Sequence, residues 1–147
     1  MRLQLALNVT DLDEAIDFYS KMFDTAPYKV KSGYANWEVE NPPLKLVIFD
    51  RPDAEPGSIN HLGVETESAD EVVAAEARVA AVGLSTSGID ETICCFAEKV
   101  ETWVQGPEGH KWEWYVKQAD HDSQLENVVV ASRDAVPSGA CSTGACC

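Results

Sequence analysis

The sequence of 147 residues lacks any apolar run that approaches the length of a membrane span, which excludes a membrane-crossing helix. It is also poor in positive charge: 11 Lys and Arg residues stand against 25 Asp and Glu residues, giving a formal net charge of -14. This balance argues against nucleic acid and anionic membrane surfaces as partners, and solubility is its simplest explanation. The apolar part of the opening segment MRLQLALNV is too short for a secretory signal, so we expect a cytoplasmic protein.

Disulfide bonds are a second feature that the sequence does not favour. The chain has five cysteines, an odd number, and a reducing compartment keeps thiols free. Four of them form two adjacent pairs, and neighbouring Cα atoms are about 3.8 Å apart, below the usual disulfide range of about 4.4–6.8 Å. Two adjacent sulfur atoms can still converge on one larger, soft atom. The pair Cys94–Cys95 therefore favours a soft ligand, with two buried hydrophobic cysteines as the alternative.

A faint internal repeat organises the chain as a strand, a helix and three short strands, twice over. Capping boxes at Thr10 and Asp13, and at Ser68 and Glu71, predict where the two helices begin. Gly83 predicts where the second helix ends. The first strand and the helix of each half fall, in chain order, at residues 3–9, 11–23, 59–66 and 68–83.

Neither half is large enough to bury a sheet face alone. We therefore predict an α+β fold in which two βαβββ modules pair into one curved mixed sheet that encloses a cleft. The predicted domain covers residues 1–118, with module one at about 1–52 and module two at about 59–118, joined by a Pro-containing linker at 51–58. Residues 119–147 have no sustained period and end in Ser, Gly and Ala, so we expect a flexible, Cys-containing tail.

Three polar residues form the candidate metal site. Alignment of the halves by their capping boxes puts Gln4 and His61 at equivalent positions of each first strand, pointing into the cleft, where a polar group needs a partner. Glu113 alternates with Trp112 and Trp114, so it points away from both tryptophans. Three ligands of N/O type would leave positions open for water, substrate or dioxygen, as in non-haem Fe(II) sites. Taken singly, each of the three is more often a structural or surface residue.

These segments resemble the vicinal oxygen chelate superfamily, which includes glyoxalase I, extradiol dioxygenases and bleomycin- and fosfomycin-resistance proteins. The resemblance covers about residues 2–118 and depends on the segments VTDLDEAIDFYSKMF, NHLGVE and GPEGHKWEWY. In that superfamily metal ligands lie at the positions matched here by Gln4, His61 and Glu113, although the first is usually His. The remaining ligand position of a glyoxalase-type site, near Leu44–Leu46, has no carboxylate in this sequence.

A closer resemblance, within the superfamily, is to the cadmium-induced protein and organoarsenical carbon–arsenic lyase family. It depends on GYANWEVENPPLKLVIF, on ETICCFAEK and on the Cys-ended tail. In that family Gln in the first strand is usual, the adjacent cysteines bind trivalent arsenic, and an Fe(II) centre uses dioxygen to cleave the carbon–arsenic bond. The resemblance implies a dioxygenase-like lyase that degrades methylarsenite or aromatic arsenicals. Its implied metal ligands and catalytic residues are Gln4, His61 and Glu113, and Ni(II), Co(II) or Mn(II) could replace Fe(II).

The chemistry of arsenic agrees with a pair of thiols. Trivalent arsenic is soft and prefers thiolate, and a monoalkyl arsenic(III) has two exchangeable positions, which Cys94 and Cys95 would fill. Successive side chains of a regular strand point to opposite faces, so we predict a mobile loop or bulge at residues 92–98. Lys99 is predicted to assist substrate binding by lowering the thiol pKa through its charge. A solvent-exposed surface lysine is the alternative.

Other functions stay open from sequence alone. A resistance protein could sequester cadmium or arsenite through thiols without turnover, and a thiol transferase or glyoxalase-like isomerase would act without the cysteine pair. The tail thiols Cys141, Cys146 and Cys147 could deliver soft metals or take no part in catalysis. The sequence does not choose between methyl and aromatic substrates, and we expect a monomer or a homodimer.

Overall fold

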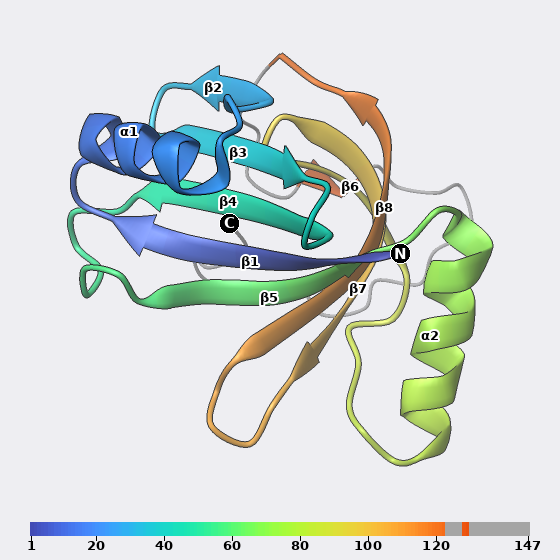
Figure 1. Cartoon of the computed structure of the whole chain (residues 1–147). Coiled ribbons are helices and arrows are strands. Elements are labelled where there is room, and N and C mark those ends of the chain that lie inside the picture. Colours follow the sequence, from blue (N-terminus) through green and yellow to red (C-terminus); the bar gives the residue numbers. More distant parts are fainter. Residues whose placement is uncertain (123–127, 130–147) are drawn as a thin grey trace. The chain divides into compact units, whose positions relative to one another are not determined.

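The computed structural model describes residues 1–122 and 128–129 of the chain. Along these residues β1, α1, β2, β3 and β4 are followed by β5, α2, β6, β7 and β8, so the predicted βαβββ repeat and the α+β class are confirmed (Figure 1). A short β9 (Val128–Val129) comes last. The predicted tail thiols lie outside the described residues. No helix within the described ranges is long and apolar enough to cross a membrane.

The chain divides into two compact units. The N-terminal unit holds Arg2–Gly63, and the C-terminal unit holds Val64–Cys147 together with Met1. β5 (Ile59–Glu65) runs through the boundary, so its first five residues belong to the N-terminal unit. Each unit is described by itself below.

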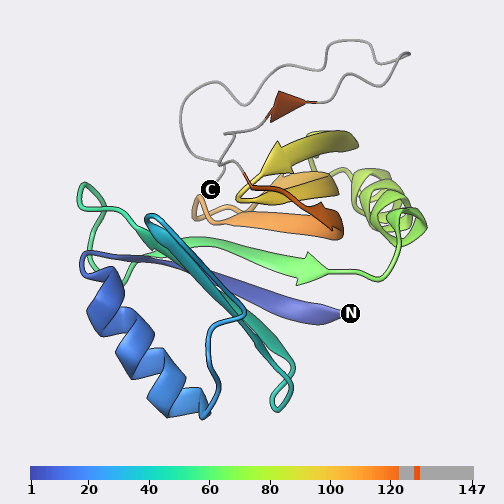
Figure 2. The ribbon, with the colours of Figure 1, turned by 90° about the horizontal axis from the view of Figure 1, so that it is seen from above.

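The N-terminal unit is a mixed sheet covered by one helix. Its strands are ordered β2-β3-β4-β1, with β1 parallel to β4 and the other neighbours antiparallel. The helix α1 packs against β3 and β4 (Figure 2). The bounds of these elements are β1 Arg2–Val9, α1 Leu12–Phe23, β2 Lys29–Lys31, β3 Tyr34–Val39 and β4 Leu44–Asp50.

Apolar side chains at every second position of the strands form the face of this sheet that α1 covers. Trp37 and Ile48 are fully buried in the apolar core beneath the helix, and Leu5 and Leu7 of β1 pack against the same cluster. Tyr19 of α1 meets Trp37 with ring centres 6.0 Å apart. Because side chains alternate, the residues between these point to the opposite face of the sheet. That second face is where the polar residues of β1 lie.

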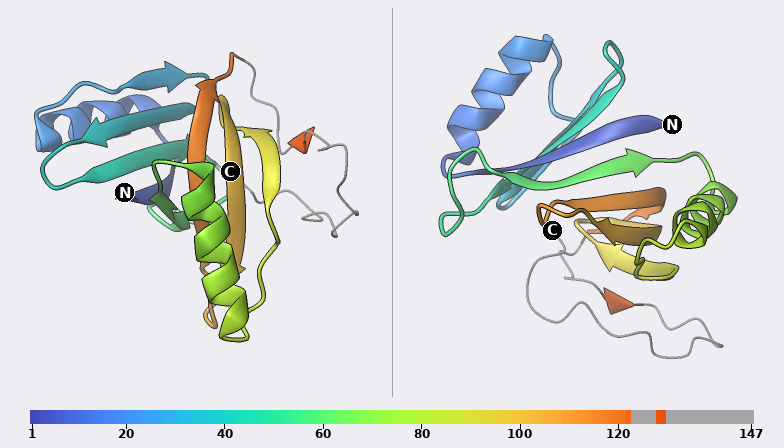
Figure 3. Two further views of the ribbon diagram at one scale, coloured as in Figure 1. Left: turned by 90° about the vertical axis from the view of Figure 1, so that its right-hand side faces the viewer. Right: turned by 90° about the horizontal axis from the view of Figure 1, so that it is seen from below.

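The C-terminal unit repeats this plan with an antiparallel sheet. β6, β7 and β8 are adjacent in that order, and α2 packs against β7 and β8 (Figure 3). The Arg78 guanidinium of α2 lies 6.0 Å from the ring centre of Trp114, so the tryptophans of β8 are on the helix side. The bounds are α2 Ala69–Ala81, β6 Asp90–Cys94, β7 Ala97–Gln105 and β8 Lys111–Asp120.

The two helix starts differ in how well the sequence predicted them. Ser68 caps α2 and accepts a hydrogen bond from the Glu71 N–H, as predicted, and Gly83 follows the helix with φ 83°. The first capping box was predicted one residue too early. Asp11, not Thr10, is the cap of α1, because its carboxylate accepts from the Glu14 N–H at 2.9 Å.

The cap of α1 gives a direct test. We expect Asp11→Ala to lower the free energy of unfolding by about 1 kcal/mol, because the N–H groups of the first turn lose their acceptor. Chemical denaturation of the full chain measures this. Thr10→Ala is the matched control, and a larger loss from Thr10→Ala than from Asp11→Ala would show that the cap is assigned to the wrong residue.

Candidate functional site

The face of the N-terminal sheet opposite α1 buries polar side chains. Gln4, Ala6 and Asn8 share this face of β1. The neighbouring strand β4 places Lys45 beside Gln4. Burying a polar group costs free energy unless the group finds a partner, so such a concentration indicates a site. The buried polar residues of this unit are Gln4, Asn8, Asn36, Lys45 and His61.

Gln4 and His61, predicted from the repeat, are brought together. They are 5 % and 4 % exposed, and Gln4 Nε2 lies 2.8 Å from His61 Nε2. An amide nitrogen only donates, so His61 Nε2 accepts and carries no proton. The other ring nitrogen, Nδ1, lies 2.8 Å from the amide oxygen of Asn60 and donates to it. The imidazole is therefore neutral, with an Nε2 lone pair that could bind a metal ion.

Glu113, the third predicted ligand, belongs to the C-terminal unit. It is fully buried on the face of β8 away from the tryptophans, as alternation predicts. Its Oε1 accepts a hydrogen bond of 2.7 Å from Lys99 Nζ. Lys99 is 8 % exposed, and its ammonium lies 4.9 Å from the ring centre of Tyr115. The surface alternative for Lys99 is therefore wrong, and its ammonium faces the carboxylate of Glu113.

Glu101 is a further site residue that the sequence reasoning missed. It is 3 % exposed, accepts from Trp103 Nε1 at 2.9 Å, and has Oε2 3.8 Å from Lys99 Nζ. The pKa of Glu101 is raised to about 7, mainly by burial; the neighbouring Glu113 also raises it, and the Lys99 ammonium and the Trp103 hydrogen bond oppose the shift. Lys99, Glu101 and Trp103 recur at every second position of β7, and this spacing is the signal that could have found Glu101.

A prediction follows from the pKa of Glu101. The pKa of Glu101 is about 7 in the folded protein and 4.5 in the unfolded chain, so the folded protein binds the carboxyl proton more tightly. The stabilisation from this proton is complete below pH 4.5 and is lost as the pH rises to about 7. Relative to Glu101→Gln, the wild-type free energy of unfolding should fall by at most roughly 3 kcal/mol over this window. Denaturation in the presence of a chelator measures it, with Glu108→Gln in an exposed turn as control. Parallel pH profiles of wild type and Glu101→Gln would contradict it.

The donor groups suit a divalent cation within each unit. An imidazole nitrogen, an amide oxygen and a carboxylate are ligands that Fe(II) and Mn(II) accept. Asn36 Oδ1 and Glu101 Oε2 are buried without a hydrogen-bond partner among the described residues, so both units have an oxygen atom that a cation or water could satisfy. Over residues 1–122 and 128–129 no group of three or more His, Cys, Asp or Glu side chains is arranged for a metal. The pair Gln4–His61 is thus seen, and the three-ligand site stays a prediction.

The adjacent thiols lie at a tight turn between β6 and β7. β6 ends at Cys94, β7 begins at Ala97, and the two residues between them, Cys95 and Phe96, have φ 54° and 64°. Residues other than Gly rarely adopt this left-handed backbone conformation, which a two-residue hairpin turn of type I′ requires at both positions. The turn brings Cys94 Sγ to 3.1 Å from Cys95 Sγ, a contact between two thiols, because a disulfide bond is about 2.05 Å long.

This turn confirms the predicted departure from strand geometry, but over a shorter segment. Residues 92–94 and 97–98 belong to regular strands, and only Cys95 and Phe96 leave the ladder. Cys94 is 1 % exposed and Cys95 is half-buried. The Phe96 carbonyl accepts from the His121 N–H at 2.8 Å, which holds the turn against the end of β8. Cys95 is thus the more accessible thiol, and the turn must open before a ligand can contact Cys94.

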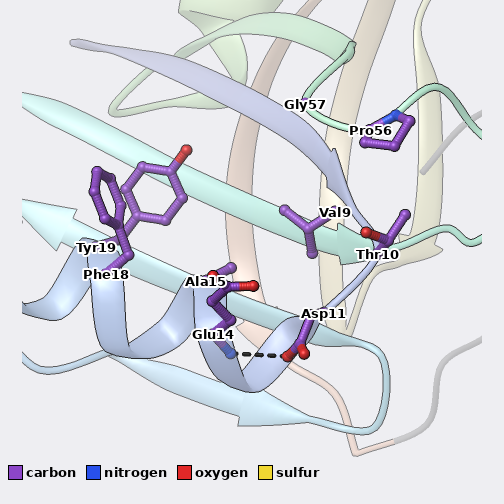
Figure 4. A pocket seen from close by; sticks show the side chains of 9 residues that line it. All are labelled: Val9, Thr10, Asp11, Glu14, Ala15, Phe18, Tyr19, Pro56 and Gly57. Atoms are coloured by element: carbon purple, nitrogen blue, oxygen red, sulfur yellow. Dashed lines mark hydrogen bonds between the residues drawn. The ribbon is translucent and has the colours of Figure 1, made fainter.

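A surface pocket of about 260 Å³ lies elsewhere in the N-terminal unit, at the start of α1 (Figure 4). It contains none of the predicted site residues. Its carboxylate Asp11 serves as the helix cap, shown by the dashed line to Glu14 (Figure 4). The lining residues are Val9, Thr10, Asp11, Glu14, Ala15, Phe18, Tyr19, Pro56 and Gly57. Nothing in this set points to metal or thiol chemistry.

Solved structures share the fold. The Mn(II)-bound glyoxalase from Novosphingobium aromaticivorans is similar with a TM-score of 0.58 and 18% identity, covering 82% of this chain and 40% of that chain. A methylmalonyl-CoA epimerase from Streptomyces coelicolor has a TM-score of 0.52 and 17% identity, covering 79% and 96%. Residues 3–114 match the family described as the Glyoxalase/Bleomycin resistance protein/Dioxygenase superfamily. One protein with this fold, the glyoxalase, was solved with Mn(II) bound.

Sequence comparison narrows the class. A protein of Thermomonospora curvata named trivalent organoarsenical cleaving enzyme is 41% identical over 99% of both chains. The cadmium-induced protein CadI of Mycobacterium bovis is 48% identical over 83% of this chain and 80% of its own. The chain therefore belongs to the Glyoxalase/Bleomycin resistance protein/Dioxygenase superfamily and, within it, to the family that holds these two proteins, as its segments predicted.

Proposed function

We propose that this protein is an enzyme that cleaves the carbon–arsenic bond of trivalent organoarsenicals and releases arsenite, in a reaction that needs Fe(II) and dioxygen. The observation that carries the proposal is the pair of thiols 3.1 Å apart, in a chain 41% identical to a trivalent organoarsenical cleaving enzyme. The substrates would be methylarsenite or aromatic arsenicals. The role would be detoxification, in the cytoplasm, by a monomer or a homodimer.

The thiols would bind the substrate. Two sulfur atoms this close can both bond to one arsenic atom, and thiolate is the ligand that trivalent arsenic prefers. Cys95 would bond first, because Cys94 is nearly inaccessible. The left-handed φ angles of Cys95 and Phe96 suit this role, because a segment held in an uncommon conformation is one that a ligand can displace.

Gln4, His61 and Glu113 would hold Fe(II), with Ni(II), Co(II) or Mn(II) as substitutes. When bound, the metal would supply a coordination position for dioxygen and the electrons that the cleavage requires. His61 contributes its Nε2 lone pair, and Gln4 would rotate its amide to present oxygen in place of nitrogen. Both residues are buried, which limits the access of bulk water to their ligand atoms.

Lys99 would serve two purposes. Its ammonium holds the Glu113 carboxylate at 2.7 Å, so the buried charge is compensated when no metal is bound. The sequence also predicts that Lys99 assists substrate binding, and its place on β7, four residues after Cys95, keeps that role in the proposal. A buried cation would favour thiolate over thiol at a neighbouring cysteine.

The second candidate is a resistance protein that binds cadmium or arsenite without turnover. The 48% identity to the cadmium-induced protein CadI favours it. A thiol pair at a tight turn would bind such soft ions by itself. In that case the buried carboxylates would only be structural.

Turnover of methylarsenite by the full chain distinguishes the two candidates. We expect protein loaded anaerobically with Fe(II) and then exposed to air to release arsenite, measured by chromatography with arsenic detection. Loss of a residue that only hydrogen-bonds to a metal ligand costs about 10–100-fold in activity. Because Glu113 would bind the metal itself, Glu113→Ala should lower the rate of arsenite release by more than this, while arsenic binding survives. Glu108→Ala, in an exposed turn, is the control for loss of a carboxylate. Cys94→Ser should weaken arsenical binding.

Two results would contradict parts of this proposal: the first would reject the enzyme and the second would reject the role of the thiol pair. Bound arsenical without arsenite release, in protein shown to contain Fe(II), would favour the binding protein. Full release from Cys94→Ser would show that the paired thiols do not hold the substrate.

A further inference from the structure

A series of hydrogen bonds connects Ser58 to His61 inside the N-terminal unit. Asn8 Nδ2 donates to Ser58 Oγ at 3.0 Å, Asn60 Nδ2 donates to Asn8 Oδ1 at 2.9 Å, and His61 Nδ1 contacts Asn60 Oδ1 at 2.8 Å. On the other side of the ring, His61 Nε2 contacts Gln4 Nε2 at 2.8 Å. Neither asparagine was predicted from the sequence as part of a site.

We propose that Asn60, oriented by Asn8, is a positioning residue that holds His61 in the tautomer protonated on Nδ1, so that Nε2 is ready for a metal ion. The inference rests on the proposed metal site but not on the arsenic chemistry. It concerns a residue that contacts neither metal nor substrate and acts through the imidazole of His61.

The direction of each hydrogen bond follows from the groups involved. A carboxamide donates only from nitrogen and accepts only on oxygen. Asn60 uses its nitrogen on Asn8, which leaves its oxygen for His61, so Nδ1 must donate. The Gln4 amide nitrogen requires the same tautomer from the opposite side, because it can only donate to Nε2. The two ends of the series agree on where the proton lies.

Burial and backbone contacts keep the series in place. Asn8 is 7 % exposed, so water cannot readily replace its partners, and turning its amide alone would place its nitrogen against the Asn60 nitrogen, so that neither could accept. The Asn8 N–H donates to the Ser58 carbonyl and the Gly57 N–H donates to the Asn8 carbonyl, both at 2.9 Å. The end of β1 is thereby joined to the segment that leads into β5, which carries Asn60 and His61. The position of Asn60 beside Asn8 and His61 is therefore a consequence of the fold.

The consequence for a metal ligand is chemical as well as geometric. An acceptor on Nδ1–H selects the tautomer, orients the ring and makes Nε2 a stronger ligand. Metal ligands of this type commonly donate to a carboxylate or a backbone carbonyl, and here a side-chain amide takes that place. Once the Gln4 amide turns, its oxygen and His61 Nε2 would face the same cation. The series thus prepares one ligand atom, His61 Nε2, before a metal arrives.

The first test reads the tautomer in the metal-free full chain. The sequence has only three histidines, so nitrogen-15 correlation spectra are simple, and His110→Gln and His121→Gln assign the signals. We expect wild-type His61 to be protonated on Nδ1. Asn60→Ala should give a mixture of tautomers, and Asn60→Asp, which restores an acceptor, should return the wild-type signature. Asn41→Ala, at an asparagine in an exposed turn, is the control and should leave the tautomer unchanged.

The second test measures Mn²⁺ binding by the loss of the free-ion electron paramagnetic resonance signal, because Mn²⁺ prefers nitrogen and oxygen ligands over thiols. Asn60→Ala should weaken binding by about 10–100-fold, and Asn60→Asp should recover most of the loss. Asn41→Ala should bind as wild type. Asn8→Ala, which leaves the acceptor but removes its support, should give a smaller loss, and it replaces Asn60→Ala if that variant does not fold.

Three results would overturn the inference. One is a wild-type His61 protonated on Nε2, which would mean that the whole series runs in the reverse direction. The second is an Asn60→Ala protein with unchanged tautomer and unchanged Mn²⁺ affinity. The third is a wild-type protein that binds no Mn²⁺. A wild type that meets both expectations and yet releases no arsenite would reject the proposed function and leave this inference standing.

Discussion

A buried polar side chain must have a partner, and this constraint governs both halves of the protein. Each unit covers one face of its sheet with a helix and an apolar core, and each buries polar groups on the other face. In the N-terminal unit the partners of His61 are Gln4 and Asn60, which leave one ring nitrogen with a lone pair. In the C-terminal unit Lys99 is the cation that compensates Glu113. Both arrangements cost stability in comparison with an apolar face, and the ligand binding that we propose would account for both.

The thiol turn is the second element of the proposed chemistry, and its physics differs from that of the buried groups. A hairpin of two residues needs positive φ at both, a conformation that Gly and Asn adopt readily and that Cys95 and Phe96 adopt at a cost. The turn brings the sulfur atoms of Cys94 and Cys95 into contact at the end of β6, whereas in a regular strand the two side chains would point to opposite faces. Cys94 stays nearly inaccessible in the observed conformation, so binding at both thiols requires the turn to change. The strained backbone and the inaccessible thiol therefore belong to the same turn.

Sequence reasoning succeeded where a residue's role depends on periodicity. Alternation in β8 placed Glu113 opposite its flanking tryptophans, and the internal repeat paired Gln4 with His61. It failed by one residue at the first helix, because Thr10 and Asp11 are both good caps and only the path of the chain selects Asp11. It missed Glu101, since a carboxylate in a strand is usually at the surface, and it assigned Lys99 to the thiols without the contact to Glu113. Asn8 and Asn60 could not be found, because their roles come from contacts between residues 52 positions apart.

By itself the sequence determined the order of strands and helices, the two repeated modules and the family, because these depend on periodicity, capping residues and local motifs that a chain carries in every conformation. Only the tertiary structure decided which polar groups are buried and what each one contacts. The pKa of Glu101 near 7, the tautomer of His61 and the pairing of Lys99 with Glu113 arise from desolvation and from neighbours distant along the chain. Such effects act over a few ångströms in space, and spacing along the sequence does not measure that distance.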